Sequence, residues 1–255
     1  MLRRLSFALA VVLICQPIVH AQWQPAKGPL MTRWAKDVSP AKVHPEYPRP
    51  QMVRKDWMNL NGLWDYKVAA DDGDSLPMKY DGQILVPFPI ESALSGVMKR
   101  VGPTDVLWYR REFTPPTMPT GGRLLLHFGA VDWRCAVIVN GKEIGEHQGG
   151  YDPFTFDITD ALQANKKTQE LVVLVGDPTD ANWQPRGKQV REPKGIWYTP
   201  TTGIWQTVWL EVVPAAYIRG LTITTNLNAD PPGAITVRVD ADVAGDDAGK
   251  YRISL

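Results

Sequence analysis

The chain has 255 residues, a formal net charge of +1 and 44% hydrophobic residues, which is enough material for one large domain or two smaller ones. This near-neutral balance gives no electrostatic case for binding nucleic acid or an anionic membrane. The ten tryptophans are a high number, and such residues either fill hydrophobic cores or offer flat faces on which sugar rings stack.

The amino-terminal residues 1–21 have the pattern of a signal peptide. Two arginines precede an apolar run over residues 5–14, and Val19 and Ala21 fit the small-residue positions of a signal-peptidase site. We therefore expect cleavage after Ala21 and a secreted or periplasmic protein. The apolar run is too short for a permanent membrane anchor. Cleavage would leave Cys135 as the only cysteine, so we expect no intrachain disulfide.

Residues 22–50 contain six prolines and no sustained hydrophobic period, so they are predicted to form an extended arm. Regular structure begins after the arm. Alternating apolar residues predict strands over Trp57–Val68, Gln83–Phe88 and Leu107–Phe113.

The central stretch Arg123–Thr159 indicates the interior of a β-sandwich. Residues Trp133–Asn140 are apolar on both faces of a strand, which is typical of an inner strand between two packed layers. Asn140-Gly141 then supplies the positive φ angles of a two-residue type I′ turn. After a glycine-rich corner, period two returns in Phe154–Ile158.

Two further strands are predicted at Leu171–Val175 and Trp205–Val213, and a long loop over residues 177–200 separates them. The loop has no clean period and holds tryptophans, prolines and several cations. Because a loop this long inside a compact sandwich is usually functional, we place the candidate site there.

After Pro214 the pattern predicts three new strands, Leu221–Thr225, Ala234–Val243 and Tyr251–Leu255. An immunoglobulin-like domain needs ~7 strands and ~100 residues. We therefore expect residues 215–255 to be an incomplete immunoglobulin-like domain, and the chain to be a fragment.

Several motifs occur in an order that resembles a known family. They are WYRREF (108–113), VNGKEIG (139–145), HQGGYDPFTFDIT (147–159) and TGIWQ (202–206). In this order they resemble the amino-terminal sugar-binding domain of glycoside hydrolase family 2, the β-galactosidase and β-glucuronidase group, from about Tyr47 to Pro214. The resemblance implies an all-β fold, with a jelly-roll or galactose-binding-like β-sandwich over residues 51–214.

The resemblance also implies where catalysis takes place. In this family two glutamates of a carboxy-terminal (β/α)₈ barrel hydrolyse β-glycosidic bonds with retention, without an organic cofactor. Nothing after Asn165 alternates strands with helices, so we assign no catalytic residue and expect no hydrolysis by this chain alone.

Other chemistry is weakly indicated. The acids Glu143, Glu146, Asp157 and Asp160 flank strand ends and are interpreted as solvated or capping residues. The histidines His44, His127 and His147 lack the spacing of metal ligands, so we predict no metal site.

Sugar contact remains. Sugars are bound by aromatic faces with convergent hydrogen-bond donors, and cations are added where a sugar carboxylate is recognised. The loop offers this mixture, and the candidate substrate-binding residues are Trp183, Gln184, Arg186, Lys188, Trp197 and Tyr198. The resemblance implies that this loop approaches the barrel's active site; alternatively, it only packs against the barrel.

One departure concerns specificity. Family members often carry a sugar-contacting aspartate a few residues before the Gly-Ile pair, where this chain has Trp197 or Tyr198. A different binding subsite is therefore expected.

We arrive at a leading hypothesis: a non-catalytic sugar-binding module of a secreted glycoside hydrolase. Its partners would be a β-glycoside substrate and the barrel of the same protein. Two alternatives stay open, namely a free-standing carbohydrate-binding or adhesion module and an inactive family member with a structural role.

Overall fold

The computed structural model describes residues 23–70, 76–229 and 234–245. The predicted signal peptide and the predicted strand Tyr251–Leu255 lie outside the described residues. Within them, the fold is almost entirely β. The strands are β1 (Trp57–Asn59), β2 (Gly62–Ala70), β3 (Gly82–Val86), β4 (Asp105–Phe113), β5 (Arg123–Phe128), β6 (Val131–Asp132), β7 (Arg134–Val139), β8 (Lys142–Gln148), β9 (Phe154–Asp157), β10 (Gln169–Gly176), β11 (Gly203–Ile204), β12 (Val208–Val213), β13 (Tyr217–Ala229) and β14 (Ala234–Ala244).

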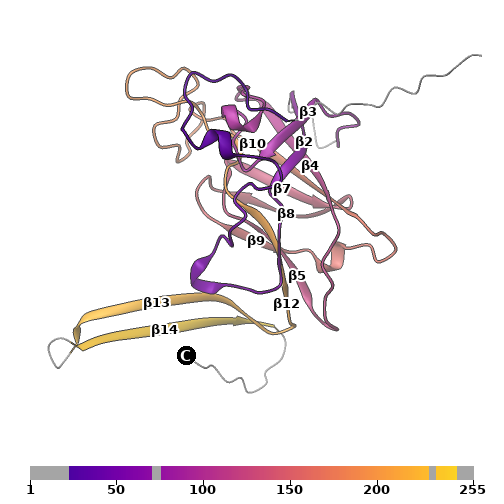
Figure 1. The fold of residues 1–255 in the computed structure, drawn as a ribbon, viewed down its shortest axis with the longest axis vertical. Coiled ribbons are helices and arrows are strands. Elements are labelled where there is room, and N and C mark those ends of the chain that lie inside the picture. Colours follow the sequence, from indigo (N-terminus) through magenta and orange to yellow (C-terminus); the bar gives the residue numbers. More distant parts are fainter. Residues whose placement is uncertain (1–22, 71–75, 230–233, 246–255) are drawn as a thin grey trace, which may run out of the picture.

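The sandwich consists of two antiparallel sheets (Figure 1). A four-stranded sheet has the order β1-β12-β5-β9, and a six-stranded sheet has the order β3-β2-β4-β10-β7-β8. Alternate residues of both sheets form one apolar core, which includes the fully buried Trp64, Tyr109 and Phe128. The expected β-sandwich is therefore confirmed.

Strand β4 shows how the sequence pattern sorts residues to the two faces of a sheet. Leu107, Tyr109 and Phe113 enter the main core. Trp108 points to the other face, where it packs with Val172 in a second, smaller cluster. This is the alternation expected of a strand with one face in the core.

The predicted hairpin turn is also present. Asn140 has φ 52° and Gly141 has φ 78°, the left-handed angles that a type I′ turn requires. The turn joins β7 to β8 at the edge of the six-stranded sheet.

The predicted strand Trp57–Val68 divides between the two sheets. Its first part, β1, pairs with β12, whereas β2 pairs with β3 and β4. At the junction, Gly62 has φ 123°, and Asn61 donates from Nδ2 to the Val43 carbonyl at 3.2 Å. Long-range contacts, rather than a local break in period, decide this crossing.

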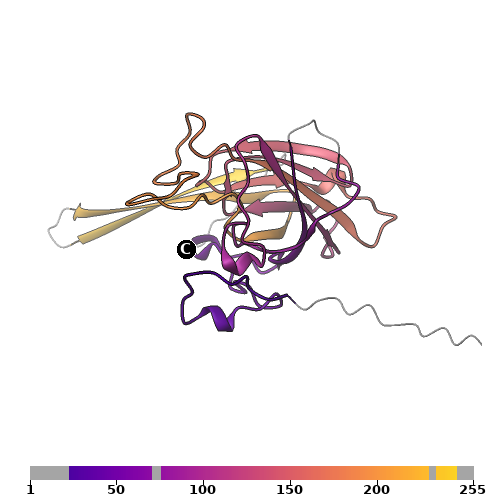
Figure 2. The ribbon, with the colours of Figure 1, turned by 90° about the horizontal axis from the view of Figure 1, so that it is seen from above.

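The arm before β1 has no strand and includes two short 3₁₀ turns, η1 (Ala35–Asp37) and η2 (Pro50–Met52). Two more 3₁₀ turns, η3 (Ala93–Ser95) and η4 (Thr159–Ala161), lie in connections. Figures 1 and 2 show the arm running along the outside of the sandwich.

After β12 the chain forms the hairpin β13–β14, which extends away from the sandwich (Figures 1 and 2). Its base approaches η2 of the arm. The long loop over residues 177–202 lies at the opposite end of the sandwich in Figure 1. Across the part of the chain that the structure describes, no helix is long and apolar enough to span a membrane.

Candidate functional site

The six predicted site residues lie on the connection between β10 and β11, and the structure brings some of them together. A parallel bridge pairs Gln189 with Tyr198. In it, the Tyr198 amide donates to the Lys188 carbonyl at 2.9 Å, and the Val190 amide donates to the Tyr198 carbonyl at 3.0 Å. The segment that carries Lys188 therefore lies beside the segment that carries Trp197 and Tyr198.

Four of the six predicted residues face solvent. Trp183 is fully exposed, Trp197 is 40% exposed and Tyr198 is 64% exposed. Lys188 is exposed as well. These side chains give the loop a surface that is both aromatic and cationic.

The other two predicted residues turn back into the loop. Arg186 is half-buried, and its Nε donates to the Gln189 carbonyl at 3.1 Å. Gln184 is half-buried, and its Nε2 donates to Asp177 Oδ1 at 2.8 Å. Both side chains help to shape the loop, and Gln184 Oε1 is itself buried.

Beneath the loop lie three acids that the sequence analysis did not single out. Asp177 accepts hydrogen bonds from the Thr179 amide at 2.8 Å and from Thr202 Oγ1 at 2.9 Å. Glu91 Oε2 accepts from the Thr202 amide at 3.0 Å. Asp132, at the end of β6, accepts through Oδ2 from Gln189 at 3.1 Å.

Burial raises the pKa of Asp132 to about 7, the charge of Asp177 adds to this effect and the hydrogen bond from Gln189 opposes it. Burial also raises the pKa of Glu91 to about 7, against the hydrogen bonds from Thr202. A raised carboxyl pKa is typical of a general acid. However, Asp132 and Asp177 are each only 2% exposed, so a substrate oxygen cannot reach them, and we interpret the acids as anchors of the loop.

Gln189 connects these acids to an aromatic pair. Its Nε2 also lies 3.4 Å from the Tyr151 hydroxyl. Tyr151 packs edge-on against Trp205 with ring centroids 6.2 Å apart, and Trp205 Nε1 donates to the Gly150 carbonyl at 2.8 Å. Both aromatic residues lie within motifs that the sequence analysis quoted, although neither was selected as a site residue.

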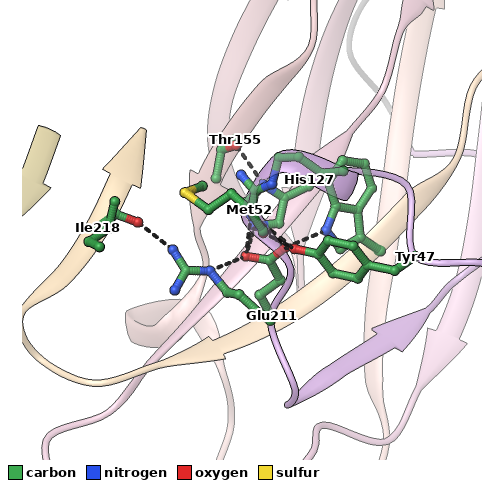
Figure 3. A network of polar contacts seen from close by, with 9 residues as sticks. Tyr47, Met52, His127, Thr155, Glu211 and Ile218 are labelled. Atoms are coloured by element: carbon green, nitrogen blue, oxygen red, sulfur yellow. Dashed lines mark hydrogen bonds and ion pairs between the residues drawn. The ribbon is translucent and has the colours of Figure 1, made fainter. Parts of the chain in front are cut away.

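A second polar network lies where the carboxy-terminal end of the arm meets the sandwich, and it centres on Glu211 of β12 (Figure 3). Its carboxylate is fully buried and lies 2.7 Å from Arg49 Nη2 and 2.6 Å from Arg54 Nε. Trp209 Nε1 donates to it at 2.8 Å, and the Tyr47 hydroxyl also contacts it. The network thus joins the arm to the sandwich.

His127 of β5 also belongs to this network. Its Nε2 is 3.2 Å from Glu211, and its Nδ1 is 2.7 Å from Thr155 Oγ1. Burial lowers the pKa of His127. Although burial alone would raise the pKa of Glu211, its contacts with His127, Tyr47 and Trp209 hold that pKa far below its ordinary value. The network is buried and links the arm to β12 and β5, as expected of a structural element, although Arg49 Nε is buried without a hydrogen-bond partner among the described residues.

No group of three or more histidine, cysteine, aspartate or glutamate side chains within residues 23–70, 76–229 and 234–245 is placed to hold a metal ion. Cys135 is buried in the core as a free thiol.

Comparison with known proteins identifies the sandwich. Residues 64–214 match the family model described as glycosyl hydrolases family 2, sugar binding domain. The β-galactosidase of Thermoanaerobacter pseudethanolicus is 26% identical over 203 residues, which cover 78% of this chain and 26% of that protein. The β-glucuronidase of Canis lupus familiaris is 28% identical over 215 residues, which cover 72% of this chain and 32% of that protein.

Solved structures agree. A β-glucuronidase from an uncultured Clostridium sp. superposes with a TM-score of 0.56 and 25% identity, covering 75% of this chain and 35% of that one. The chain therefore spans about a quarter to a third of the length of the curated relatives it matches.

Proposed function

The chain belongs to glycosyl hydrolases family 2, and from this premise we propose that it is the non-catalytic sugar-binding module of a secreted glycosidase that hydrolyses O-glycosyl bonds. The observation that carries the proposal is the exposed aromatic and cationic loop on the sandwich that matches the family's sugar-binding domain. The relatives named β-galactosidase and β-glucuronidase support a β-glycoside as the ligand.

Within the loop, the proposed sugar contacts are Trp183, Trp197 and Tyr198 through their ring faces, and Lys188 as a cationic donor. Flat aromatic side chains bind the apolar face of a sugar ring, and an ammonium group supplies hydrogen bonds to hydroxyl or carboxylate oxygens. Gln184 and Arg186 would act mainly by holding the shape of the loop.

The catalytic carboxylates are proposed to lie outside residues 1–255, in a barrel of the same protein. Glycoside hydrolysis requires two carboxyl groups on either side of the scissile bond. The two buried acids Asp132 and Asp177 do not meet this requirement, because each is only 2% exposed and is bonded to a glutamine of the loop.

The absence of catalysis is directly testable. The 255-residue chain is incubated with 4-nitrophenyl β-D-galactoside, β-D-glucuronide and β-D-glucoside, and release of nitrophenol is followed. We expect no release above the buffer rate. Turnover that disappears in Asp132→Asn would place the chemistry on this chain and overturn the proposal.

Sugar binding by the loop has its own test. Saturation-transfer NMR of the chain with a pool of β-linked disaccharides should show transfer that the double variant Trp197→Ala/Tyr198→Ala reduces severalfold. Trp34→Ala, which removes a tryptophan that is 61% exposed on the arm, serves as the control and should change nothing. Equal transfer in the double variant and the unmodified chain would remove the loop from the proposal.

Secretion is the remaining element of the proposal, and it rests on the residue pattern before Gln22. Amino-terminal sequencing of the exported protein should begin at Gln22. A mature protein that retains Arg3 and Arg4 would contradict it.

A further inference from the structure

A groove of about 650 Å³ lies between the arm and the sandwich, outside the six predicted site residues. We call it the arm groove. The arm contributes residues 44–50 to one wall, and the sandwich contributes Tyr151, Trp205, Gln206, Thr207 and Trp209. Pockets for small ligands have volumes of roughly 300–1,000 Å³, so this one is large enough for a sugar unit.

The sandwich wall of the arm groove carries an aromatic pair that is fixed in place. Tyr151 is 47% exposed, and Trp205 is half-buried with its indole nitrogen bonded to Gly150. The two rings meet edge-on. Rings that are already immobilised lose little freedom when a sugar stacks on them, which favours binding.

The groove is also lined by polar side chains, one of which packs closely against Gly129. A Cβ at Gly129 would lie 2.7 Å from Gln206 Cβ and 3.0 Å from Gln206 Oε1, so glycine is required where this side chain crosses the backbone. Gln206 and Thr207 line the groove beside the aromatic wall, and the Thr207 hydroxyl already accepts a hydrogen bond from Asn61 Nδ2 at 3.2 Å. Amide and hydroxyl groups bond to sugar hydroxyls as donors and acceptors.

The charged side chains that line the groove contact other charged groups of the protein. Arg49 Nη2 lies 2.7 Å from both carboxylate oxygens of Glu211, and His44 Nδ1 lies 3.3 Å from Glu46 Oε1. The Arg49 guanidinium is therefore already held by a carboxylate of the protein. The loop differs, because Lys188 is exposed there.

We propose that the arm groove is a subsite for a neutral sugar unit, chemically distinct from the cationic loop. The proposal rests on the proposed function for the class of ligand, a carbohydrate. Tyr151 belongs to the groove wall, and its hydroxyl contacts Gln189 of the loop. The two surfaces therefore adjoin, so that a glycan with its neutral unit in the groove meets the loop with a neighbouring unit.

The test uses the 255-residue chain and saturation-transfer NMR with two probe sets. The first is a pool of neutral disaccharides (cellobiose, lactose, mannobiose and xylobiose), and the second is methyl β-D-glucuronide. We expect transfer to the neutral pool to weaken ~3- to 10-fold in Tyr151→Ala, because one stacking face is lost. The control is Trp34→Ala, which removes an exposed aromatic side chain that does not line the arm groove and should leave transfer to the neutral pool intact.

A further variant separates stacking from an indirect effect through the loop. Tyr151→Phe keeps the ring and removes the hydroxyl that contacts Gln189, so it should bind the neutral pool like the unmodified chain. Gln206→Ala tests the groove without touching the aromatic wall and should weaken binding severalfold. Thermal unfolding of each variant establishes that it is folded.

The outcomes separate the subsite from the proposed function. Neutral sugars bound only through Trp197 and Tyr198 would overturn the arm groove and leave the proposed function standing. Unchanged binding in both Tyr151→Ala and Gln206→Ala would also overturn it, as would a preference of the groove for the glucuronide.

Discussion

At the residue scale, the structure depends most on a single buried carboxylate. Glu211 is fully buried, and two arginines, Arg49 of the arm and Arg54 just after it, approach it within 2.7 Å. A buried ion pair adds little relative to apolar residues of the same size, but removing one member leaves the other charge buried and uncompensated. The consequence of a substitution is therefore much larger than the net contribution of the pair.

We predict that Glu211→Gln lowers the free energy of unfolding by about 3–5 kcal/mol, because it leaves Arg49 and Arg54 without a counter-charge. Urea unfolding followed by tryptophan fluorescence measures the change. The matched control is Glu112→Gln, since Glu112 pairs with Arg110 at 2.8 Å but is 56% exposed, and its loss should cost less than ~1 kcal/mol. Equal effects of the two substitutions would contradict this assignment.

A second residue-scale prediction concerns Asp132. Because its folded pKa is raised to about 7, the folded protein holds the proton over a pH range in which the unfolded chain has released it. Stability from this group is therefore complete below about pH 4 and declines as the pH rises towards 7. The side-chain amide introduced by Asp132→Asn cannot ionise, so this decline should disappear in the variant.

The measurement compares the melting temperatures of Asp132→Asn and the unmodified chain from pH 5 to pH 8. The melting temperature of the variant minus that of the unmodified chain should rise by several degrees from pH 5 to pH 8. A pH-independent cost of the substitution itself does not affect this rise. The comparison with the unmodified chain is needed because His127 has the opposite pH dependence. Its pKa is lowered, so its contribution to the stability of the protein declines as the pH falls through 6.5. A constant difference between the two proteins would contradict the raised pKa.

At this scale, the sequence allowed the exposed aromatic residues of the loop to be located. Trp183, Trp197 and Tyr198 were recognisable because aromatic residues in an aperiodic loop have no core to enter. Asp132 and Asp177 were not recognisable, since an acid at a strand end is usually solvated. Their burial follows from the 177–202 loop folding over them, a long-range contact that local pattern does not encode.

At the element scale, one side chain makes several of the contacts that order the 177–202 loop. Gln189 donates to Asp132 and accepts from the Thr201 amide, and its backbone takes part in the bridge to Tyr198. A loop without strands of its own is ordered only by such contacts. The proposed sugar-contacting surface therefore depends on an amide that is itself only half-exposed.

We predict that Gln189→Ala releases the loop while the sandwich stays folded. Hydrogen exchange of the Val190 and Tyr198 amides, which bond across the bridge, should accelerate at least tenfold, and amides of the buried strand β10 should be unaffected. Lys188→Ala, which removes the neighbouring exposed side chain, is the control and should leave exchange unchanged. Equal protection in both variants would show that other contacts order the loop.

The strands themselves were largely predictable. The period-two runs at β4, β7 and β10 and the Asn140-Gly141 turn were all located from the sequence, because each strand has at least one face in the core. The division of Trp57–Val68 between β1 and β2 was not predicted. Both halves are apolar, and only the positive φ of Gly62 and the bonds of Asn61 mark the crossing.

At the scale of the whole molecule, the core and the hairpin are separate. In the described part of the chain, the buried residues of the main core lie between Leu60 and Leu210. Hairpin β13–β14 pairs with itself and meets the arm through Arg54, which bonds to the Ile218 carbonyl and lies over the Tyr217 ring. This arrangement supports the proposed division of the chain at Pro214.

Two truncations should therefore differ strongly in their effect on the melting temperature. A chain that ends at Pro214 keeps the whole core and the Glu211 network, so we predict a melting temperature within a few degrees of that of the full chain. A chain that begins at Asp56 loses Tyr47, Arg49 and Arg54. It buries Glu211 with no arginine beside it, and we predict that it melts at least ~10 °C lower or fails to fold.

Replacing Glu211 in the shortened chain distinguishes the charge from the packing of the arm. If the unpaired carboxylate causes the loss, Glu211→Leu should restore part of the stability of the chain that begins at Asp56, because an apolar side chain has no charge to desolvate. The same substitution in the full chain should be destabilising, since it leaves both arginines facing an apolar side chain. Differential scanning calorimetry of the four proteins measures both effects. Destabilisation by Glu211→Leu in both backgrounds would instead show that the arm stabilises the sandwich through its apolar contacts.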